Sequence, residues 1–552
     1  MAKKVKSRSF RYRAPRFNGQ VEILETLRDA RQMIADVDTE ISAMMRYVQG
    51  QIEMSVSFVE IGFAVDSFTQ EMARKARQLG LTEKLAVFGR TSPPDLEAIA
   101  IMSEFGIQNA VVVAKSRLLD VKRDLRIAPE ANLELIEKSV RYLKDGGFFV
   151  ILDLEFATDA VFGRKEYGSA MNPAEKKANR DYFFKVLEVG IAGGADRLVI
   201  CDTSGGALPK EIGNLFDFLT SVYPEIAFGI HCHNDFGLAV ANTMEAVLHG
   251  AVHAQVVTNG YGERAGNTDA ASLYAIFQER IGRSILPAER LGGLSNLAED
   301  FSAGFGFGRD TGSPITGRRV CSTSAGMHQA GNNKVAGTYL PFNPLNYGNI
   351  SREMLNCQSG IASIIAKSKQ VGVVLDREQA LIFKEQFQQM IECSAYEVSD
   401  DAFMLACWIV RGEFQSFFAI KEFEARSSSD GNGGKKLARG NVKILIGKKE
   451  KHEIQDGNGP YDALSKALRK ALKWHYPTIR DAVLKSYQFK AIDVSEEGSG
   501  SVVRVVAEFS DSDGKTWSSV GISTDSNEAG FRALVAGLQF YLFISNVENK
   551  HT

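Results

Sequence analysis

The sequence is poor in cysteine, in long apolar runs and in net charge. Six cysteines among 552 residues, with no Cys-x-x-Cys pair, exclude a disulfide scaffold and are typical of reduced thiols in the cytoplasm. No apolar run approaches the ~18 residues that a membrane-spanning helix needs. Lysine and arginine number 65 against 67 aspartates and glutamates, which argues against a dedicated nucleic-acid binder. These absences predict a soluble, cytoplasmic protein with neither a membrane nor a nucleic acid as partner.

The first residues lack the apolar core of a secretory signal. Residues 1–18 are instead rich in lysine and arginine. We predict a solvated basic tail there, with a regulatory or targeting arm as the alternative.

Between residues 20 and 260 the sequence alternates short β-rich runs with longer amphipathic segments. Eight runs are predicted to be strands: 20–24, 57–62, 85–89, 109–114, 148–155, 196–202, 226–233 and 252–259. Segments 129–145 and 234–250 place apolar residues at the three- and four-residue spacing of helices. Eight such units predict an α/β fold, a (β/α)8 TIM barrel over residues 19–290. An open doubly wound sheet is the alternative, but its first strand more often leads into a glycine-rich turn, which LETLRDARQ lacks.

Beyond the barrel the pattern is less regular. Residues 291–425 are predicted to form helical subdomains, and the Ser/Gly/Lys-rich stretch 426–440 a flexible linker. Residues 441–552 contain two similar halves, each β-rich and followed by one amphipathic helix. This internal duplication predicts an α+β regulatory or dimerisation domain rather than a catalytic one.

Polar residues gather where the predicted strands end, which is where barrel enzymes place functional groups. His231 and His233 are two positions apart on one strand, so both imidazoles point to the same face. With a carboxylate from another strand, for which Asp29 is the best candidate, they would form a divalent metal site. Buried, hydrogen-bonded structural histidines are the alternative. Cys232 points the opposite way and is predicted to lie in the core.

Two further groups near this point could take part in chemistry. Arg28, beside the predicted metal, could stabilise an enolate or alkoxide, and a structural pair with a carboxylate is the alternative. Glu155 follows an apolar strand and could position a base or pair with Arg28. Gly260, Gly262 and Gly266 could let a ligand approach the backbone, although such glycines more often make a turn.

Several motifs together resemble the acyl-CoA-condensing branch of the DRE-TIM metallolyase superfamily. They are LRDARQ (27–32), CDTSGGALP (201–209), GIHCHNDFGLAVANTMEAVLHGA followed by NGYGERAGNTD (229–269), STSAGMHQAG (322–331) and GNGPYDALSKALRKAL. This branch contains the 2-isopropylmalate, citramalate and homocitrate synthases. AVFGRT (86–91) and the stretch 112–126 make the citramalate synthases the nearest resemblance.

The resemblance implies an acyltransferase that condenses acetyl-CoA with a 2-oxo acid, pyruvate above all, to give citramalate for isoleucine biosynthesis. A divalent metal, Mg²⁺, Mn²⁺ or Zn²⁺, would act as a Lewis acid on the oxo acid. The implied metal ligands are Asp29, His231 and His233, with Asn267 as a further or water-mediated ligand.

The resemblance also implies roles for residues around the metal. Arg28 would steady the developing negative charge, and Glu155 would orient the reacting groups. His328 and Tyr339 would assist proton transfer, often from a neighbouring subunit. The implied substrate-binding residues are Thr203, which would hold the carboxylate, and Gln32 and Asp120.

The C-terminal resemblance implies a homodimer that responds to a branched-chain amino acid. Gly457 and Gly459 precede a predicted helix, where backbone N–H groups could receive the carboxylate of such an effector. Plain helix capping is the alternative for these two glycines.

The sequence departs from the family pattern in places. The first motif is usually DTTLRDGxQ, but here Leu24 and Glu25 replace the leading Asp-Thr and Ala30 replaces the glycine. Histidines usual in the family are replaced near Asp120 and by Phe156. The alternatives are therefore a 2-isopropylmalate synthase acting on 2-oxoisovalerate, a lyase or aldolase of the same superfamily, and a catalytically silent amino-acid-sensing homologue.

Overall fold

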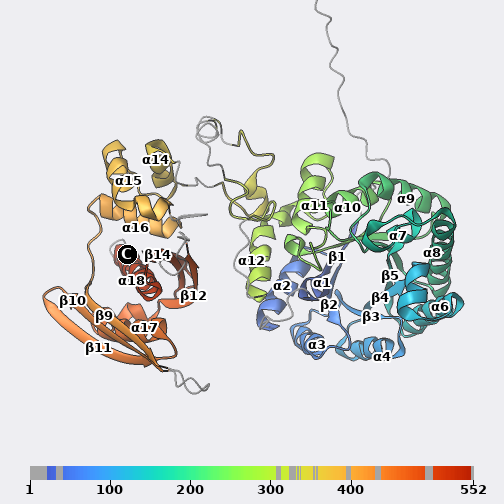
Figure 1. The fold of residues 1–552 in the computed structure, drawn as a ribbon, viewed down its shortest axis with the longest axis horizontal. Coiled ribbons are helices and arrows are strands. Elements are labelled where there is room, and N and C mark those ends of the chain that lie inside the picture. Colours follow the sequence, from blue (N-terminus) through green and yellow to red (C-terminus); the bar gives the residue numbers. More distant parts are fainter. Residues whose placement is uncertain are drawn as a thin grey trace, which may run out of the picture. The chain divides into compact units, whose positions relative to one another are not determined.

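The N-terminal part of the chain forms a closed, parallel, eight-stranded barrel (Figure 1). The structure is a computed structural model, and it describes residues 21–32, 41–305, 312–322, 331, 335, 337–351, 355, 359–392, 399–428, 437–491 and 501–548. The barrel strands are β1 (Glu22–Thr26), β2 (Phe58–Phe63), β3 (Leu85–Arg90), β4 (Asn109–Lys115), β5 (Phe149–Glu155), β6 (Arg197–Asp202), β7 (Phe228–Cys232) and β8 (His253–Val256). They pair in sequence order, and β8 closes on β1. The barrel prediction is confirmed, and the open sheet is excluded.

Helices surround the barrel, as Figure 1 shows. They are α1 (Leu27–Gln32), α2 (Ile41–Glu53), α3 (Ser67–Leu79), α4 (Pro93–Met102), α5 (Leu118–Asp120), α6 (Pro129–Asp145), α7 (Ala157–Phe162), α8 (Pro173–Gly193), α9 (Pro209–Val222), α10 (Ala239–Leu248), α11 (Ala270–Ile276) and α12 (Leu294–Gly304). The predicted helix 129–145 is α6. The helix predicted from 234 begins only at Ala239, because the preceding residues form a turn in which the Asn234 side chain accepts from the Ala239 N–H.

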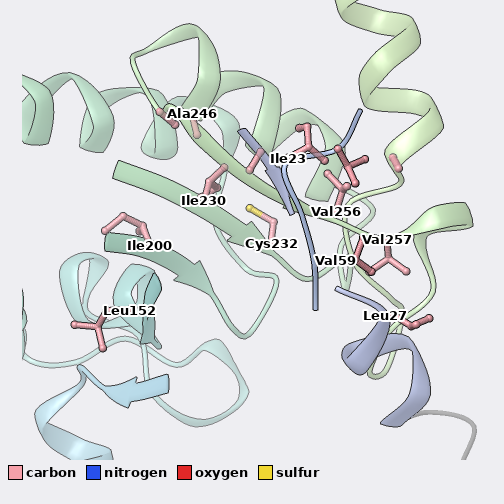
Figure 2. Packing of buried hydrophobic residues seen from close by; sticks show 14 of the residues in the cluster. Ile23, Leu27, Val59, Leu152, Ile200, Ile230, Cys232, Ala246, Val256 and Val257 are labelled. Carbon is pink, nitrogen blue, oxygen red and sulfur yellow. The ribbon is translucent and has the colours of Figure 1, made fainter. Parts of the chain in front are cut away.

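Two apolar layers hold the barrel together. Inside it, Leu24, Phe88 and Ile151 belong to a small cluster of buried residues. A larger cluster lies between strands and helices, and Figure 2 shows Cys232 within it beside Ile230. The prediction that Cys232 lies in the core is therefore confirmed. Each fully buried aliphatic side chain of this kind contributes about 1.5–3 kcal/mol to folding.

The departures in the first motif are absorbed by this packing. Leu24 lies in the inner cluster, and Ala30 in the outer one. Glu25 is fully buried and points outward, where the Tyr47 hydroxyl and the Thr258 N–H donate to its Oε1. Burial raises the pKa of Glu25 to about 7. Glu25 thus ties β1 to α2 and to the segment after β8.

The chain divides into two compact units, and each is described by itself. The first is Met1–Cys321 with Leu340–Ser351, and the second is Ser322–Tyr339 with Arg352–Thr552. The second contains α14 (Ile361–Gln370), α15 (Arg377–Glu392) and α16 (Asp400–Val410). Among the described residues, no helix combines the length and the apolarity needed to span a membrane.

The C-terminal part of the second unit is duplicated, as predicted. One half has the sheet β11-β10-β9 with helix α17, and the other has β12-β13-β14 with α18. The bounds are β9 (Ala419–Ser428), β10 (Leu437–Ile446), β11 (Lys449–Gly457), α17 (Pro460–Leu472), β12 (Val483–Ala491), β13 (Val503–Ser510), β14 (Thr516–Ser523) and α18 (Ser526–Glu548).

The linker predicted over 426–440 needs correction. Residues 426–428 end β9 and residues 437–440 begin β10, and the two strands pair antiparallel. Residues 429–436 lie outside the described residues. The first half of the duplicated domain therefore starts at β9, within the region predicted to be helical, because pairing with β10 gives this polar segment its backbone hydrogen bonds.

Candidate active site

Three side chains predicted to bind a metal come together at the carboxyl end of the barrel. Asp29 lies on α1, directly after β1, while His231 lies on β7 and His233 just after it. One ligand atom from each lies within 4.8 Å of the others, and all three residues are buried. The Nε2 atoms of the two histidines are 3.4 Å apart, and Nε2 of His231 is 3.6 Å from Oδ2 of Asp29.

The residues around this cluster fit a divalent cation. Asn267 donates its Nδ2 to Asp29, and its buried Oδ1 has no hydrogen-bond partner among the described residues. Burial would raise the pKa of Asp29, but the nearby Arg28 and the two imidazoles lower it below its usual range. Burial and the neighbouring His231 lower the pKa of His233 to about 3, which keeps that ring neutral. Carboxylate and neutral imidazole are ligands that suit divalent metals.

The loop after β8 that carries Asn267 depends on two glycines. A Cβ on Gly262 would lie 2.8 Å from Cγ of Asn267. Gly266 has φ +95°, and a Cβ there would lie 2.0 Å from the carbonyl oxygen of Gly260. Both glycines therefore pack against other residues of the same loop rather than against a ligand. This tight packing holds the Asn267 amide against Asp29.

Arg28 is held in a fixed position beside the cluster. Its Nε donates to Oε1 of Glu60 at 2.6 Å, and its Nη1 donates to Oε1 of Gln32 at 3.1 Å. Its guanidinium carbon lies 4.1 Å from the centre of the Phe88 ring. Burial opposes the charged form, but Glu60 and Asp29 raise the pKa of Arg28, so it stays a cation. Glu60, which was absent from the predicted site residues, lies in the middle of β2 and is fully buried.

A cavity of about 340 Å³ opens beside these groups. Its lining includes both apolar and charged or polar side chains. It is lined by Arg28, Asp29, Gln32, Phe63, Phe88, Arg90, Thr91, Val113, Lys115, Leu125, Asp153, Glu155, Cys201, Thr203, His231, His233 and Glu263. Most of the predicted site residues of the barrel are in this set.

Glu155 ends β5, and Thr203 directly follows the neighbouring strand β6; both line the cavity. Glu155 pairs with Nζ of Lys115 at 2.9 Å, not with Arg28, so the predicted alternative of an Arg28 pair is wrong. The Thr203 hydroxyl accepts from the Phe156 N–H at 2.8 Å, which leaves its own hydrogen to be donated. Lys115 was not predicted as a site residue, although it directly follows a predicted strand.

Asp120 is not among the residues that line the cavity in the described part of the chain. Its carboxylate takes two hydrogen bonds from Arg117, at 2.6 Å from Nε and 2.8 Å from Nη2. The same guanidinium lies 4.2 Å from the centre of the Phe156 ring. The structure pairs Asp120 with a buried arginine, and a direct substrate-binding role for Asp120 stays a prediction.

The two residues predicted to assist proton transfer are His328 and Tyr339, and neither belongs to the described residues of the barrel unit. His328 lies outside the described residues. Tyr339 is described, is 46% exposed, and belongs to the second unit. Their roles stay predictions.

The two glycines predicted to bind an effector both precede α17. Gly457 ends β11, and a Cβ there would lie 2.5 Å from the backbone nitrogen of Ala463, so close packing alone requires glycine. Gly459 is the N-cap of α17 and faces open space. An effector role for either stays a prediction.

Comparison with known proteins places this geometry in a family. The HMGL-like family matches residues 20–291, and the LeuA allosteric (dimerisation) domain matches residues 397–542. The (R)-citramalate synthase of Synechocystis sp. is 30% identical over 461 residues, which cover 80% of each chain. The chain belongs to the citramalate synthase/2-isopropylmalate synthase family. It is therefore an enzyme of the acyltransferase type.

Other members of this family cover more of the chain. The (R)-citramalate synthase of Aquifex aeolicus is 29% identical and covers 92% of this chain and 95% of its own. The "Probable 2-isopropylmalate synthase" of Methanopyrus kandleri is 27% identical and covers 93% and 96%. Among solved structures, the HMG-CoA lyase of Bacillus subtilis is 18% identical, with a TM-score of 0.43, over 54% of this chain and 98% of that one.

Proposed function

We propose that this protein is a metal-dependent citramalate synthase that condenses acetyl-CoA with pyruvate and releases citramalate and CoA, in isoleucine biosynthesis. The observation that carries the proposal is the buried cluster of Asp29, His231 and His233 beside Arg28 in one cavity. The names of the citramalate synthase relatives support it. The buried thiols of Cys201, Cys232 and Cys407 support a reducing, cytoplasmic location.

The bulky apolar side chains in the cavity lining support a small oxo acid as the substrate. Phe63 and Phe88 meet edge to face with their ring centres 4.8 Å apart, and Val113 lines the cavity with them. We propose that these side chains would contact the methyl group of pyruvate and would oppose a branched side chain. Because one methylene is worth about 1–3 kcal/mol of discrimination, this preference would be graded.

The proposed reaction joins the methyl carbon of the acetyl group to the ketone carbon of the oxo acid. The methyl group loses a proton, the ketone oxygen gains one, and water then cleaves the thioester to a carboxylate and the CoA thiol with release of a proton. Asp29, His231, His233 and Asn267 would hold the metal, and when bound it supplies Lewis-acid polarisation of the oxo acid.

The chain's own side chains would do the rest. Arg28, held by Glu60, provides a fixed cation for the negative charge that develops on oxygen. Thr203 can donate its hydroxyl hydrogen to the substrate carboxylate. Glu155, paired with Lys115, would orient the reacting groups at the cavity wall.

A substrate panel tests the proposal. Purified protein with acetyl-CoA and Mg²⁺ or Mn²⁺ is offered pyruvate, 2-oxobutyrate, 2-oxoisovalerate and 2-oxoglutarate, and the released thiol is measured. We expect turnover with pyruvate to exceed that with every other acid. Preference for 2-oxoisovalerate would establish the second candidate, a 2-isopropylmalate synthase, which the Methanopyrus kandleri relative favours.

The C-terminal unit would regulate the enzyme. Because residues 397–542 match the LeuA allosteric (dimerisation) domain, we propose a homodimer controlled by a branched-chain amino acid. Light scattering should give twice the chain mass, and isoleucine should inhibit turnover. Isoleucine binding without turnover on any acid would instead establish the silent sensing homologue.

A further inference from the structure

Gln255 on β8 connects the candidate metal cluster to a buried carboxyl that the proposed mechanism does not use. Its Oε1 lies 2.7 Å from Nδ1 of His231. Its Nε2 donates to Oδ1 of Asp153, on β5, at 2.8 Å. All three side chains are buried. They form a chain of two hydrogen bonds that crosses the interior of the barrel.

The two bonds determine which ring nitrogen of His231 carries hydrogen. A glutamine amide has one end that only donates and one that only accepts. Since Nε2 of Gln255 donates to Asp153, the end that faces His231 is the carbonyl oxygen. Oδ1 of Asp153 accepts in either protonation state. A carbonyl facing Nδ1 requires hydrogen there, and in a neutral imidazole the lone pair is then on Nε2.

That lone pair points where the other ligands converge. Nε2 of His231 lies 3.4 Å from Nε2 of His233 and 3.6 Å from Oδ2 of Asp29. The opposite tautomer would place hydrogen at this point and remove one ligand. The neighbouring ring has no such support, because Nδ1 of His233 has no hydrogen-bond partner among the described residues.

We infer that Gln255 is a positioning residue that fixes His231 in its metal-binding tautomer, with Asp153 orienting the Gln255 amide. The inference rests on the proposed metal site. It goes beyond that site because it makes the metal affinity depend on Gln255 and Asp153, which are not among the proposed metal ligands. Residues that support a ligand in this way typically change metal affinity by about 10- to 100-fold when they are altered.

The test measures Mn²⁺ affinity of the full chain by electron paramagnetic resonance of the free ion. Gln255→Met keeps the length of the side chain and removes both hydrogen bonds, and we expect the Kd for Mn²⁺ to rise about 10- to 100-fold. The matched control is Gln539→Met, which removes a buried glutamine of the second unit that bonds Ser416 and Phe418. Its Kd should equal that of the wild-type protein.

A pair of exchange variants separates positioning from mere packing. Gln255→Glu alone still accepts from His231 but places a second carboxyl against Asp153, and it should bind Mn²⁺ weakly. Asp153→Asn combined with Gln255→Glu restores a donor facing an acceptor and should recover affinity. A purely structural role predicts no such recovery, and this pair decides the question if Gln255→Met does not fold.

The outcomes are distinct. Wild-type protein that binds no Mn²⁺ overturns the proposed metal-dependent function, and this inference with it. Wild-type binding together with unchanged affinity in Gln255→Met, or no recovery in the exchange pair, overturns the positioning role alone.

Discussion

His231 and His253 lie on neighbouring strands of one barrel, and both are buried, yet their surroundings differ. His253 begins β8 at the amino end, where its Nδ1 is 3.6 Å from Glu22, and Glu22 is already paired with Arg197. His231 lies near the carboxyl end of β7, where Asp29 and a second imidazole converge on it. Burial lowers the pKa of both rings. Burial alone therefore does not mark a functional histidine, whereas convergence of further ligands at the carboxyl end does.

The largest expected contrast is in turnover. His233→Ala removes one of three converging ligands, so we expect activity to fall to background. Mn²⁺ affinity should fall by more than the about 10- to 100-fold typical of a residue that only supports a ligand. Thiol release and Mn²⁺ titration measure both, and unchanged activity would refute the site.

The complementary change acts at the other end of the barrel. His253→Ala leaves a cavity among buried residues, and we expect a loss of about 2–4 kcal/mol in the free energy of unfolding, as in other large-to-small core changes. The kcat and the Mn²⁺ Kd of the folded variant should match those of the wild-type protein. Denaturant unfolding measures the stability, and steady-state kinetics measures kcat. A loss of kcat without a loss of stability would show that His253 is also a functional residue, contrary to this prediction.

Metal binding should raise the free energy of unfolding only when the ligands at the carboxyl end of the barrel are intact. At a free Mn²⁺ concentration of about 100 times Kd, we expect a gain of about 2.7 kcal/mol in the free energy of unfolding. The gain should persist in His253→Ala and vanish in His233→Ala. Thermal unfolding of the barrel with Mn²⁺ and with a chelator measures it, and equal stabilisation of both variants would place the metal elsewhere.

The smallest effect concerns pH at the amino end. Burial opposes ionisation of Glu22, but His253 and Arg197 lower its pKa from 4.5 to about 2. A lowered pKa means stability that is present above pH 4.5 and is lost as the pH falls toward 2. Glu22→Gln should flatten unfolding free energy against pH in this window. A slope identical to that of the wild-type protein would contradict the assignment.

The strands and the metal cluster could be predicted because both follow from local pattern. Apolar runs located the barrel strands, and residues directly after them share one end of a parallel barrel. The partners of Arg28 and Asp120 could not be predicted in this way. Glu60 and Arg117 reach them through side-chain directions that strand ends do not specify.

Strands β9 and β10 and the role of Gln255 were missed, although the sequence holds some indication of each. Ser, Gly and Lys made residues 426–440 look like a linker, but cross-strand pairing of β9 with β10 outweighs that composition. Gln255 alternates with Ala254 and Val256, which pack outward against the helices. A polar residue between two outward-packing apolar residues of a barrel strand is therefore a sequence signal for a buried hydrogen-bond chain.

The cluster of Arg117, Asp120 and Phe156 has a consequence for how this sequence can diverge. Changing Asp120 alone would leave a buried guanidinium without its carboxylate, and changing Phe156 alone would remove the ring that covers it. These positions are therefore expected to mutate as a set. Comparing relatives one site at a time at the two places where histidines are replaced would count a single coordinated exchange as separate losses.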